Sequence, residues 1–179
     1  GAELEVADME NRNVLLKTAV DEFLETSEEH YDYVIIDCPP SLGLLVINAM
    51  CAVHEMLIPI QAEYYALEGL GQLINTIGLV QEHFNPSLLV STMLITMFDK
   101  RTLLSREVHD EVKNHYPTIV LNTTIPRTVK ISEAPSFNQS VIAYDPKGMG
   151  AIAYCEAALE IARRSQTVLK AIDARRNEN

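Results

Sequence analysis

Residues 31–40 read Tyr-Asp-Tyr-Val-Ile-Ile-Asp-Cys-Pro-Pro, and this stretch gives the clearest structural signal in the chain. Residues 33–36 form a β-branched and aromatic run that is typical of a strand in a covered parallel sheet. Asp37 follows where that strand would end, and Pro39 and Pro40 make a stiff loop after it. In nucleotide-hydrolysing folds an acid at this point holds Mg²⁺, often through a bound water. The simpler alternative, which this run alone favours, is a strand whose last aspartate caps the next helix.

Further apolar runs follow along the chain, and amphipathic segments separate them. Strands are predicted in two strong and two weaker runs, at residues 56–60, 88–97, 120–125 and 141–144. Helical spacing of apolar residues marks four other segments, at residues 14–29, 67–84, 104–116 and 152–172. This alternation predicts βαβ units, and therefore an α/β fold with a mainly parallel, doubly wound sheet and helices on both faces.

The predicted sheet also indicates where a ligand would bind, because ligands in such folds lie beyond the carboxyl ends of the strands. The loops concerned begin at Asp37, Gln61, Phe98, Pro126 and Asp145. Residues 94–101 and 125–127 place polar or basic groups at strand ends, where nucleotide-switch proteins recognise the base. Each of these two signals is weak alone, since a turn with a proline is common.

Length and composition fit one globular domain. The chain has 179 residues, and 47% of them are apolar. No apolar run approaches the roughly 20 residues of a membrane-spanning helix, and the acidic residues 1–10 do not resemble a signal peptide. The three cysteines form no Cys-x-x-Cys pair, which favours a reducing cytoplasm over a disulfide framework or a zinc site.

The formal net charge of −11 argues at first against a nucleic-acid partner. However, residues 1–37 hold eleven acids and only two bases, so most of the excess lies there. Between residues 100 and 130 the balance reverses, with three acids and six bases: Lys100, Arg101, Arg106, Lys113, Arg127 and Lys130. Local potential decides whether phosphate is attracted, so DNA binding stays open.

Two further patterns are negative. Gly148-x-Gly150 lacks a third glycine and a following Lys-Ser/Thr, so it is interpreted as a tight turn that leads into a helix. No Gly-x-x-x-x-Gly-Lys-Ser/Thr phosphate loop occurs in the 179 residues, and the five histidines show no metal-ligand spacing.

Several stretches taken together resemble the ParA family of partition ATPases, in particular its Soj-like chromosomal branch. The resemblance covers about residues 1–164, and residues 165–179 match nothing recognisable. The matching stretches are residues 32–43, 59–69, 96–102, 125–127, 131–136 and 144–147. Each is modest alone, but their order and spacing together are specific. The fold this implies is the P-loop NTPase-like, deviant-Walker class.

The resemblance implies an ATPase that dimerises around ATP and Mg²⁺, binds DNA without sequence preference when dimeric, and is stimulated by a ParB-like partner. Its site residues would divide by role. Asp37 would be the catalytic, magnesium-side acid, with Pro39, Pro40 and Gly43 as the switch loop. Met97, Pro126 and Arg127 would form the edge of the adenine pocket. Arg101 and Lys130 would contact DNA; Lys130 is often arginine in the family, yet a lysine still offers phosphate a charge.

The main departure from the family is an absence. Family members begin with a Gly-rich loop that carries two lysines, and this chain matches them only from a point after it. Backbone N–H groups of such loops supply much of the grip on phosphate. We therefore expect a truncated amino end, no useful ATP affinity and no hydrolysis by this chain alone. Exposed apolar surface and unpaired strand edges would favour self-association.

Two alternatives remain open. A MinD-like ATPase of the membrane surface shares the fold, but residues 170–179 lack the bulky apolar face of an amphipathic anchor, which disfavours a membrane partner. A non-catalytic interaction domain without a phosphate loop is the other. The favoured expectation is a cytoplasmic, nucleoid-associated protein. The sequence leaves open the cargo (chromosome or plasmid), the activating partner, the oligomeric state and the role of residues 165–179.

Overall fold

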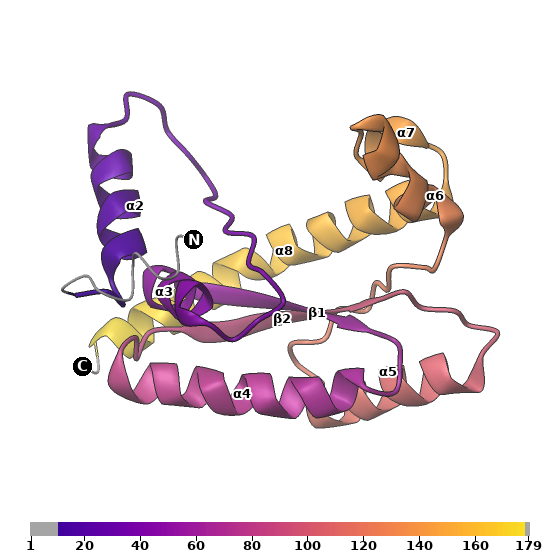
Figure 1. The fold of residues 1–179 in the computed structure, drawn as a ribbon, viewed down its shortest axis with the longest axis horizontal. Helices are drawn as coiled ribbons and strands as arrows, with labels where there is room; N and C mark the ends of the chain where they lie inside the picture. The colour runs from indigo at the N-terminus through magenta and orange to yellow at the C-terminus, as the bar shows by residue number, and fades with distance from the viewer. Residues whose placement is uncertain (1–10, 178–179) are drawn as a thin grey trace. The chain divides into compact units, whose positions relative to one another are not determined.

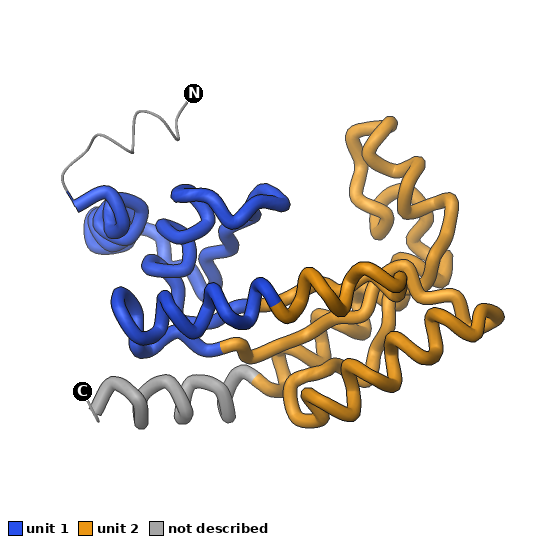
Figure 2. The backbone as a smooth tube through the Cα atoms, turned by 60° about the horizontal axis from the view of Figure 1, so that its bottom comes forward, with its two compact units in different colours: residues 1–56, 72–89, 175–179 blue, residues 57–71, 90–174 orange. Residues whose placement is uncertain are grey.

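The structure is a computed structural model that describes the backbone of residues 11–177 and the side chains of residues 11–164. The chain divides into two compact units, coloured separately in Figure 2. Unit 1 comprises residues 1–56, 72–89 and 175–179, and unit 2 comprises residues 57–71 and 90–174.

Unit 2 holds most of a parallel sheet flanked by helices. Strands β1 (Glu55–Gln61) and β2 (Leu89–Thr96) lie where the sequence predicts them, and they are neighbours in the sheet. Figure 1 shows α8 (Met149–Asn177) along one face of these strands and α5 (Leu103–His115) along the other. Buried side chains from β2, the following segments and α8 form one core, which contains Leu94, Leu121, Ile125, Ala153 and Ala157.

A third segment runs beside β2 without becoming a continuous strand. Parallel bridges join Met93 to Val120 and Phe98 to Pro126. Backbone hydrogen bonds support them, including Leu121 N–H to the Met93 carbonyl and Ile125 N–H to the Ile95 carbonyl (2.9 and 2.8 Å). The weaker strand prediction at residues 120–125 is therefore confirmed in part.

Three helices of unit 2 begin at hydroxyl caps that the sequence supplies. Thr102 accepts from Ser105 N–H at the start of α5, and Thr128 accepts from Ile131 N–H at the start of α6 (Val129–Glu133). Ser140 accepts from Ala143 N–H at the start of α7 (Val141–Tyr144). Such caps satisfy N–H groups that have no partner within the helix. A 3-10 turn, η1 (Ala134–Phe137), joins α6 to α7.

Unit 1 contains α2 (Leu15–Thr26), α3 (Leu44–Ala52) and most of α4 (Ala66–His83). Two buried asparagines hold its segments together. Asn48 donates to the Arg12 carbonyl at 2.5 Å, and Asn85 donates to the Met50 and Val53 carbonyls, each at 2.8 Å. Because a buried amide without partners is costly, these contacts fix the ends of the helices.

Two strand predictions are wrong. Residues 33–36 lie in a segment without regular secondary structure, where the Tyr33 and Ile35 side chains are 63% and 89% exposed. A strand needs a neighbour for its backbone groups, and among the described residues the sheet consists of β1 and β2. Residues 141–144 form α7 instead, because the Ser140 cap outweighs the β-propensity of Val141 and Ile142.

No helix in the described part of the chain is long and apolar enough to cross a membrane.

Candidate functional site

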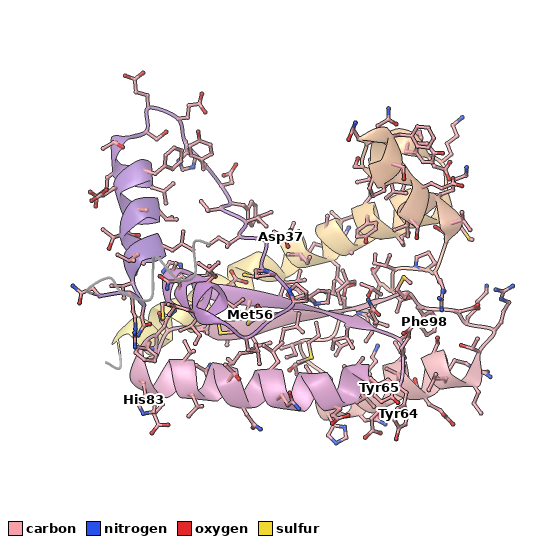
Figure 3. The ribbon with its side chains drawn as sticks, viewed as in Figure 1. Asp37, Met56, Tyr64, Tyr65, His83 and Phe98 are labelled. Carbon is pink, nitrogen blue, oxygen red and sulfur yellow. The ribbon has the colours of Figure 1, made fainter. Side chains whose placement is uncertain are left out.

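The segments that follow β1 and β2 in unit 2 meet at one edge of the sheet. Ala62 N–H donates to the Thr96 carbonyl at 2.9 Å, which joins the two strand ends. Tyr64 and Tyr65 follow β1 and Phe98 follows β2, and Figure 3 shows all three at this end of the strands. The carboxyl ends of parallel strands share an edge, so this is where the sequence predicts a ligand.

Met97 and Pro126, both predicted at the edge of an adenine pocket, are brought together here. Met97 has a φ of 55°, in the left-handed region that a side chain other than glycine seldom adopts. After this turn, Phe98 N–H donates to the Ile125 carbonyl and Arg127 N–H donates to the Phe98 carbonyl, each at 3.0 Å. Unusual backbone of this kind is often found at functional sites.

Arg127, the third predicted adenine-pocket residue, reaches across to the segment after β1. Its Nη1 atom lies 3.5 Å from Glu63 Oε1, and both side chains are about half exposed. Three segments, after β1, after β2 and after residue 125, are therefore linked by backbone and side-chain contacts.

Arg101, predicted to contact DNA, is held by a carboxylate two residues before it. Its Nε atom donates to Asp99 Oδ1 at 3.0 Å and its Nη2 atom donates to Oδ2 at 2.8 Å. The Arg101 backbone N–H also donates to Oδ1, at 3.0 Å. The side-chain and backbone hydrogen bonds from Arg101 lower the pKa of Asp99 to about 2, so the carboxylate stays charged at neutral pH.

Lys130, the other predicted DNA contact, has a similar arrangement in α6. Its Nζ atom lies 3.0 Å from Glu133 Oε2 and 5.3 Å from the centroid of the Tyr144 ring. Tyr144 Oη donates to the same Glu133 oxygen at 3.2 Å, and its ring stacks on Phe137 with centroids 5.0 Å apart. The hydrogen bond with Lys130 lowers the pKa of Glu133, and that with Glu133 raises the pKa of Lys130.

The remaining predicted residues, Asp37, Pro39, Pro40 and Gly43, lie in unit 1. Asp37 is exposed and belongs to the segment between α2 and α3. Gly43, not Asp37, is the N-cap residue of α3, so the interpretation of Asp37 as a helix cap is wrong. Burial, and then the charge of Asp37, raise the pKa of the Cys38 thiol.

The described residues fit a nucleotide and Mg²⁺ only in part. Among them, no three His, Cys, Asp or Glu side chains gather to hold a metal by themselves. One exposed carboxylate such as Asp37 is nevertheless sufficient where phosphate oxygens and water complete the coordination of Mg²⁺. A phosphate cradle of backbone N–H groups is not among the described segments.

The Gly148-x-Gly150 pair lies at a tight turn that leads into α8, as predicted, and both glycines are also closely packed. A Cβ atom at Gly148 would collide with the Asp145 carboxylate, and one at Gly150 would lie 2.8 Å from Ile131 Cγ1. Gly148 N–H donates to the Asp145 carbonyl at 2.9 Å, which closes the turn before α8.

Comparison with known proteins identifies the family. A family model described as "AAA domain" matches residues 1–90. The sporulation initiation inhibitor protein Soj of Bacillus subtilis is 51% identical over 162 residues, which are 90% of this chain and 62% of Soj. The chain belongs to the ParA/Soj-like family.

Other members agree with this assignment. The chromosome partitioning protein ParA of Myxococcus xanthus is 44% identical over 164 residues, which are 92% of this chain and 56% of that protein. The chain thus spans 62% and 56% of these two curated relatives.

Among solved structures, cobyrinic acid a,c-diamide synthase from Mycobacterium smegmatis with bound ADP and magnesium is 37% identical, with a TM-score of 0.73. The match covers 93% of this chain and 59% of that one. It supports the P-loop NTPase-like α/β fold expected for a ParA-like chain.

Sequence reasoning assigned no role to four residues that the structure places at the site. They are the three carboxylates Glu63, Asp99 and Glu133, together with Tyr144. The spacing of Lys130 and Glu133, three apart in a helix, could have indicated their ion pair. The pairing of Glu63 with Arg127 could not be predicted, because 64 positions separate them.

Proposed function

We propose that the chain is part of an ATP-dependent partitioning switch that dimerises on ATP and binds double-stranded DNA without sequence preference. The observation that carries the proposal is the 51% identity to Soj over 90% of the chain. The linked loops at the carboxyl edge of unit 2 support it, because they hold the predicted nucleotide-side residues Met97, Pro126 and Arg127 close to the predicted DNA contact Arg101.

In this proposal ATP and Mg²⁺ bind in the full-length protein. The Asp37 carboxylate is exposed, so it is available to hold Mg²⁺ together with phosphate oxygens and water. Pro39, Pro40 and Gly43 form the loop that responds to the γ-phosphate, and Met97, Pro126 and Arg127 border the adenine. Since the 179 residues contain no phosphate-loop motif, we expect a polypeptide of this sequence alone not to hydrolyse ATP.

In this proposal, tight DNA binding requires two copies of the protein on one duplex. Arg101 and Lys130 are exposed, and they supply too few charges for tight binding by one copy at physiological salt. An ATP-dependent homodimer presents both residues twice to one duplex, so the second contact gains from the first. A ParB-like activator then stimulates hydrolysis and releases the DNA. The proposed location is the cytoplasm, on the nucleoid and not on a membrane.

The test is a gel-shift titration of random-sequence duplex DNA with the full-length protein, with ATP, with ADP and without nucleotide. We expect retardation with ATP only. An Arg101→Ala, Lys130→Ala variant should bind at least about tenfold more weakly, because it loses phosphate contacts, and its affinity should also depend less on salt. Arg106→Ala is the matched control, since Arg106 is an exposed arginine on α5, five residues after Arg101 in the chain.

Retardation that is equal in all nucleotide states, or insensitive to the loss of Arg101 and Lys130, would overturn the proposal. Absence of retardation together with sedimentation of the ATP-bound protein with anionic vesicles would favour the MinD-like membrane-surface alternative. If neither DNA nor vesicles bind, the non-catalytic interaction domain becomes the better interpretation.

A further inference from the structure

Both proposed DNA-contacting bases already have a carboxylate partner within unit 2. The Arg101 side chain is 85% exposed, and its guanidinium donates two hydrogen bonds to Asp99, whose side chain is only 21% exposed. The ammonium of Lys130 pairs with Glu133 and lies over the Tyr144 ring. The two acids thus already form ion pairs with the cationic groups that DNA phosphates would bind.

Each carboxylate also accepts a hydrogen bond that does not come from the side chain of its base. Asp99 also accepts the Arg101 backbone N–H, and its own backbone N–H lies 3.4 Å from Ser105 Oγ. Glu133 accepts from the Tyr144 hydroxyl, and Tyr144 is fixed by stacking on Phe137. Because the acids are anchored, a phosphate that takes the base leaves the carboxylate beside it, and the carboxylate repels the phosphate.

We propose that Asp99 and Glu133 are internal competitors of DNA phosphate, which keep Arg101 and Lys130 in ion pairs and so weaken DNA binding by a single copy. The inference rests on the proposed function, because it concerns the same two bases. It accounts for why binding would require a dimer: each copy must break its own ion pairs before it gains a phosphate contact. A single copy then gains little net binding free energy. Two copies on one duplex gain more, because the second copy's contacts form within the same complex.

Salt dependence offers a readout that a change in folding would not imitate. When phosphate displaces Asp99, condensed cations leave the DNA, but the released carboxylate attracts cations from solution. This uptake offsets part of the release, so the slope of log K against log salt is shallower than the number of contacts implies. Without the Asp99 charge there is no such uptake.

The experiment compares Asp99→Asn and Glu133→Gln with the wild-type full-length protein in ATP, by fluorescence anisotropy on random duplex DNA at several salt concentrations. For each variant we expect about threefold to tenfold tighter binding, as one competing ion pair and one repelling charge are removed. The salt slope of Asp99→Asn should steepen by about 0.5 to 1. Glu107→Gln, which removes the same charge from an exposed position on α5, should change affinity less than twofold.

A double-mutant cycle tests whether the effect passes through the base. In an Arg101→Ala background, Asp99→Asn should gain no more than Glu107→Gln does, because no base remains to be released. Asp99→Asn and Glu133→Gln that bind no tighter than Glu107→Gln, while Arg101→Ala still weakens binding, would overturn this inference and leave the proposed function standing. If Arg101→Ala and Lys130→Ala have no effect either, the proposed function itself fails.

Discussion

At the scale of single residues, the Glu160 side chain accepts hydrogen bonds from two residues of the segment beside β2 and from Arg164. Its two oxygens accept from the backbone N–H groups of Asn122 and Thr123 at 2.9 and 3.0 Å, and from the side chains of both. Arg164, one turn later on α8, pairs with Glu160 at 2.6 Å and donates to the Val120 carbonyl. This pair attaches the segment that runs beside β2 to the last helix.

We expect Glu160→Gln to lower the free energy of unfolding by about 1–2 kcal/mol at pH 7, because an amide cannot accept all these bonds and leaves Arg164 without its ion pair. Burial raises the pKa of Glu160, but the hydrogen bonds from Asn122 and Thr123 and the charge of Arg164 outweigh it, so the pKa lies below its ordinary value of 4.5. A lowered folded-state pKa stabilises the protein above the unfolded value. The difference between wild type and variant should therefore shrink as the pH falls below 4.5.

Urea unfolding followed by helical circular dichroism, repeated from pH 7 down to pH 3.5, measures this difference. Glu156→Gln is the matched control, because Glu156 is exposed one turn earlier on the same helix. A cost that is the same for both variants, or that does not diminish in acid, would show that the Glu160 contacts add nothing to stability.

At the scale of elements, the contact between α6 and α8 depends on a glycine. A Cβ atom at Gly150 would lie 2.8 and 3.0 Å from two atoms of Ile131, which packs against the core of unit 2. By contrast, a Cβ atom at Gly78 in α4 would meet nothing within 4 Å. The same substitution should thus have opposite effects in the two helices.

Gly78→Ala should raise the free energy of unfolding by about 0.5–1 kcal/mol, since alanine is the better helix former. Gly150→Ala gains the same propensity, but it must displace Ile131, and overpacking costs about 1–3 kcal/mol. We expect a net loss at residue 150, and weaker DNA binding as well because α6 carries Lys130. Thermal unfolding of both variants decides the matter: a Gly150→Ala protein as stable as Gly78→Ala would contradict the close packing of α6 on α8.

The sequence predicted those elements whose signal is local or strongly periodic. Helical spacing located α2, α4, α5 and α8, and continuous apolar runs located β1 and β2. Three further elements, α3, α6 and η1, were not predicted. Helix α3 is apolar at every position except Asn48 and therefore shows no periodic stripe, while α6 and η1 are too short for one to appear.

The candidate site was predicted as loops at strand ends, and its ion pairs were not. Strand order brings Met97 and Pro126 together, so the rule for parallel sheets was sufficient for them. The ion pairs of Arg101 with Asp99 and of Arg127 with Glu63 depend on how individual side chains orient. No spacing rule predicts the pairing of Glu63 with Arg127. Residues 33–36 show the converse: a strong strand signal produces no strand where no neighbouring strand pairs with it.

At the scale of the whole molecule, residues 33–36 give the described chain an exposed segment with high β-propensity. Tyr33, Val34 and Ile35 are 63%, 47% and 89% exposed, and no regular secondary structure engages their backbone. A segment of this kind pairs readily with another copy of itself, because pairing satisfies its backbone groups and buries apolar side chains.

We therefore expect a purified polypeptide of these 179 residues to self-associate with rising concentration, as measured by sedimentation velocity between about 5 and 200 μM. Ile35→Lys should shift the distribution toward the monomer, since a charged side chain opposes pairing at a strand edge. Leu79→Lys is the control: Leu79 is 59% exposed on α4, so it loses similar apolar surface from a helix whose backbone is already hydrogen-bonded. If both lysine variants reduce association equally, general hydrophobicity drives it. If only Ile35→Lys does, strand pairing by residues 33–36 is the cause, and the same segment is the place where the folded protein needs a neighbouring strand.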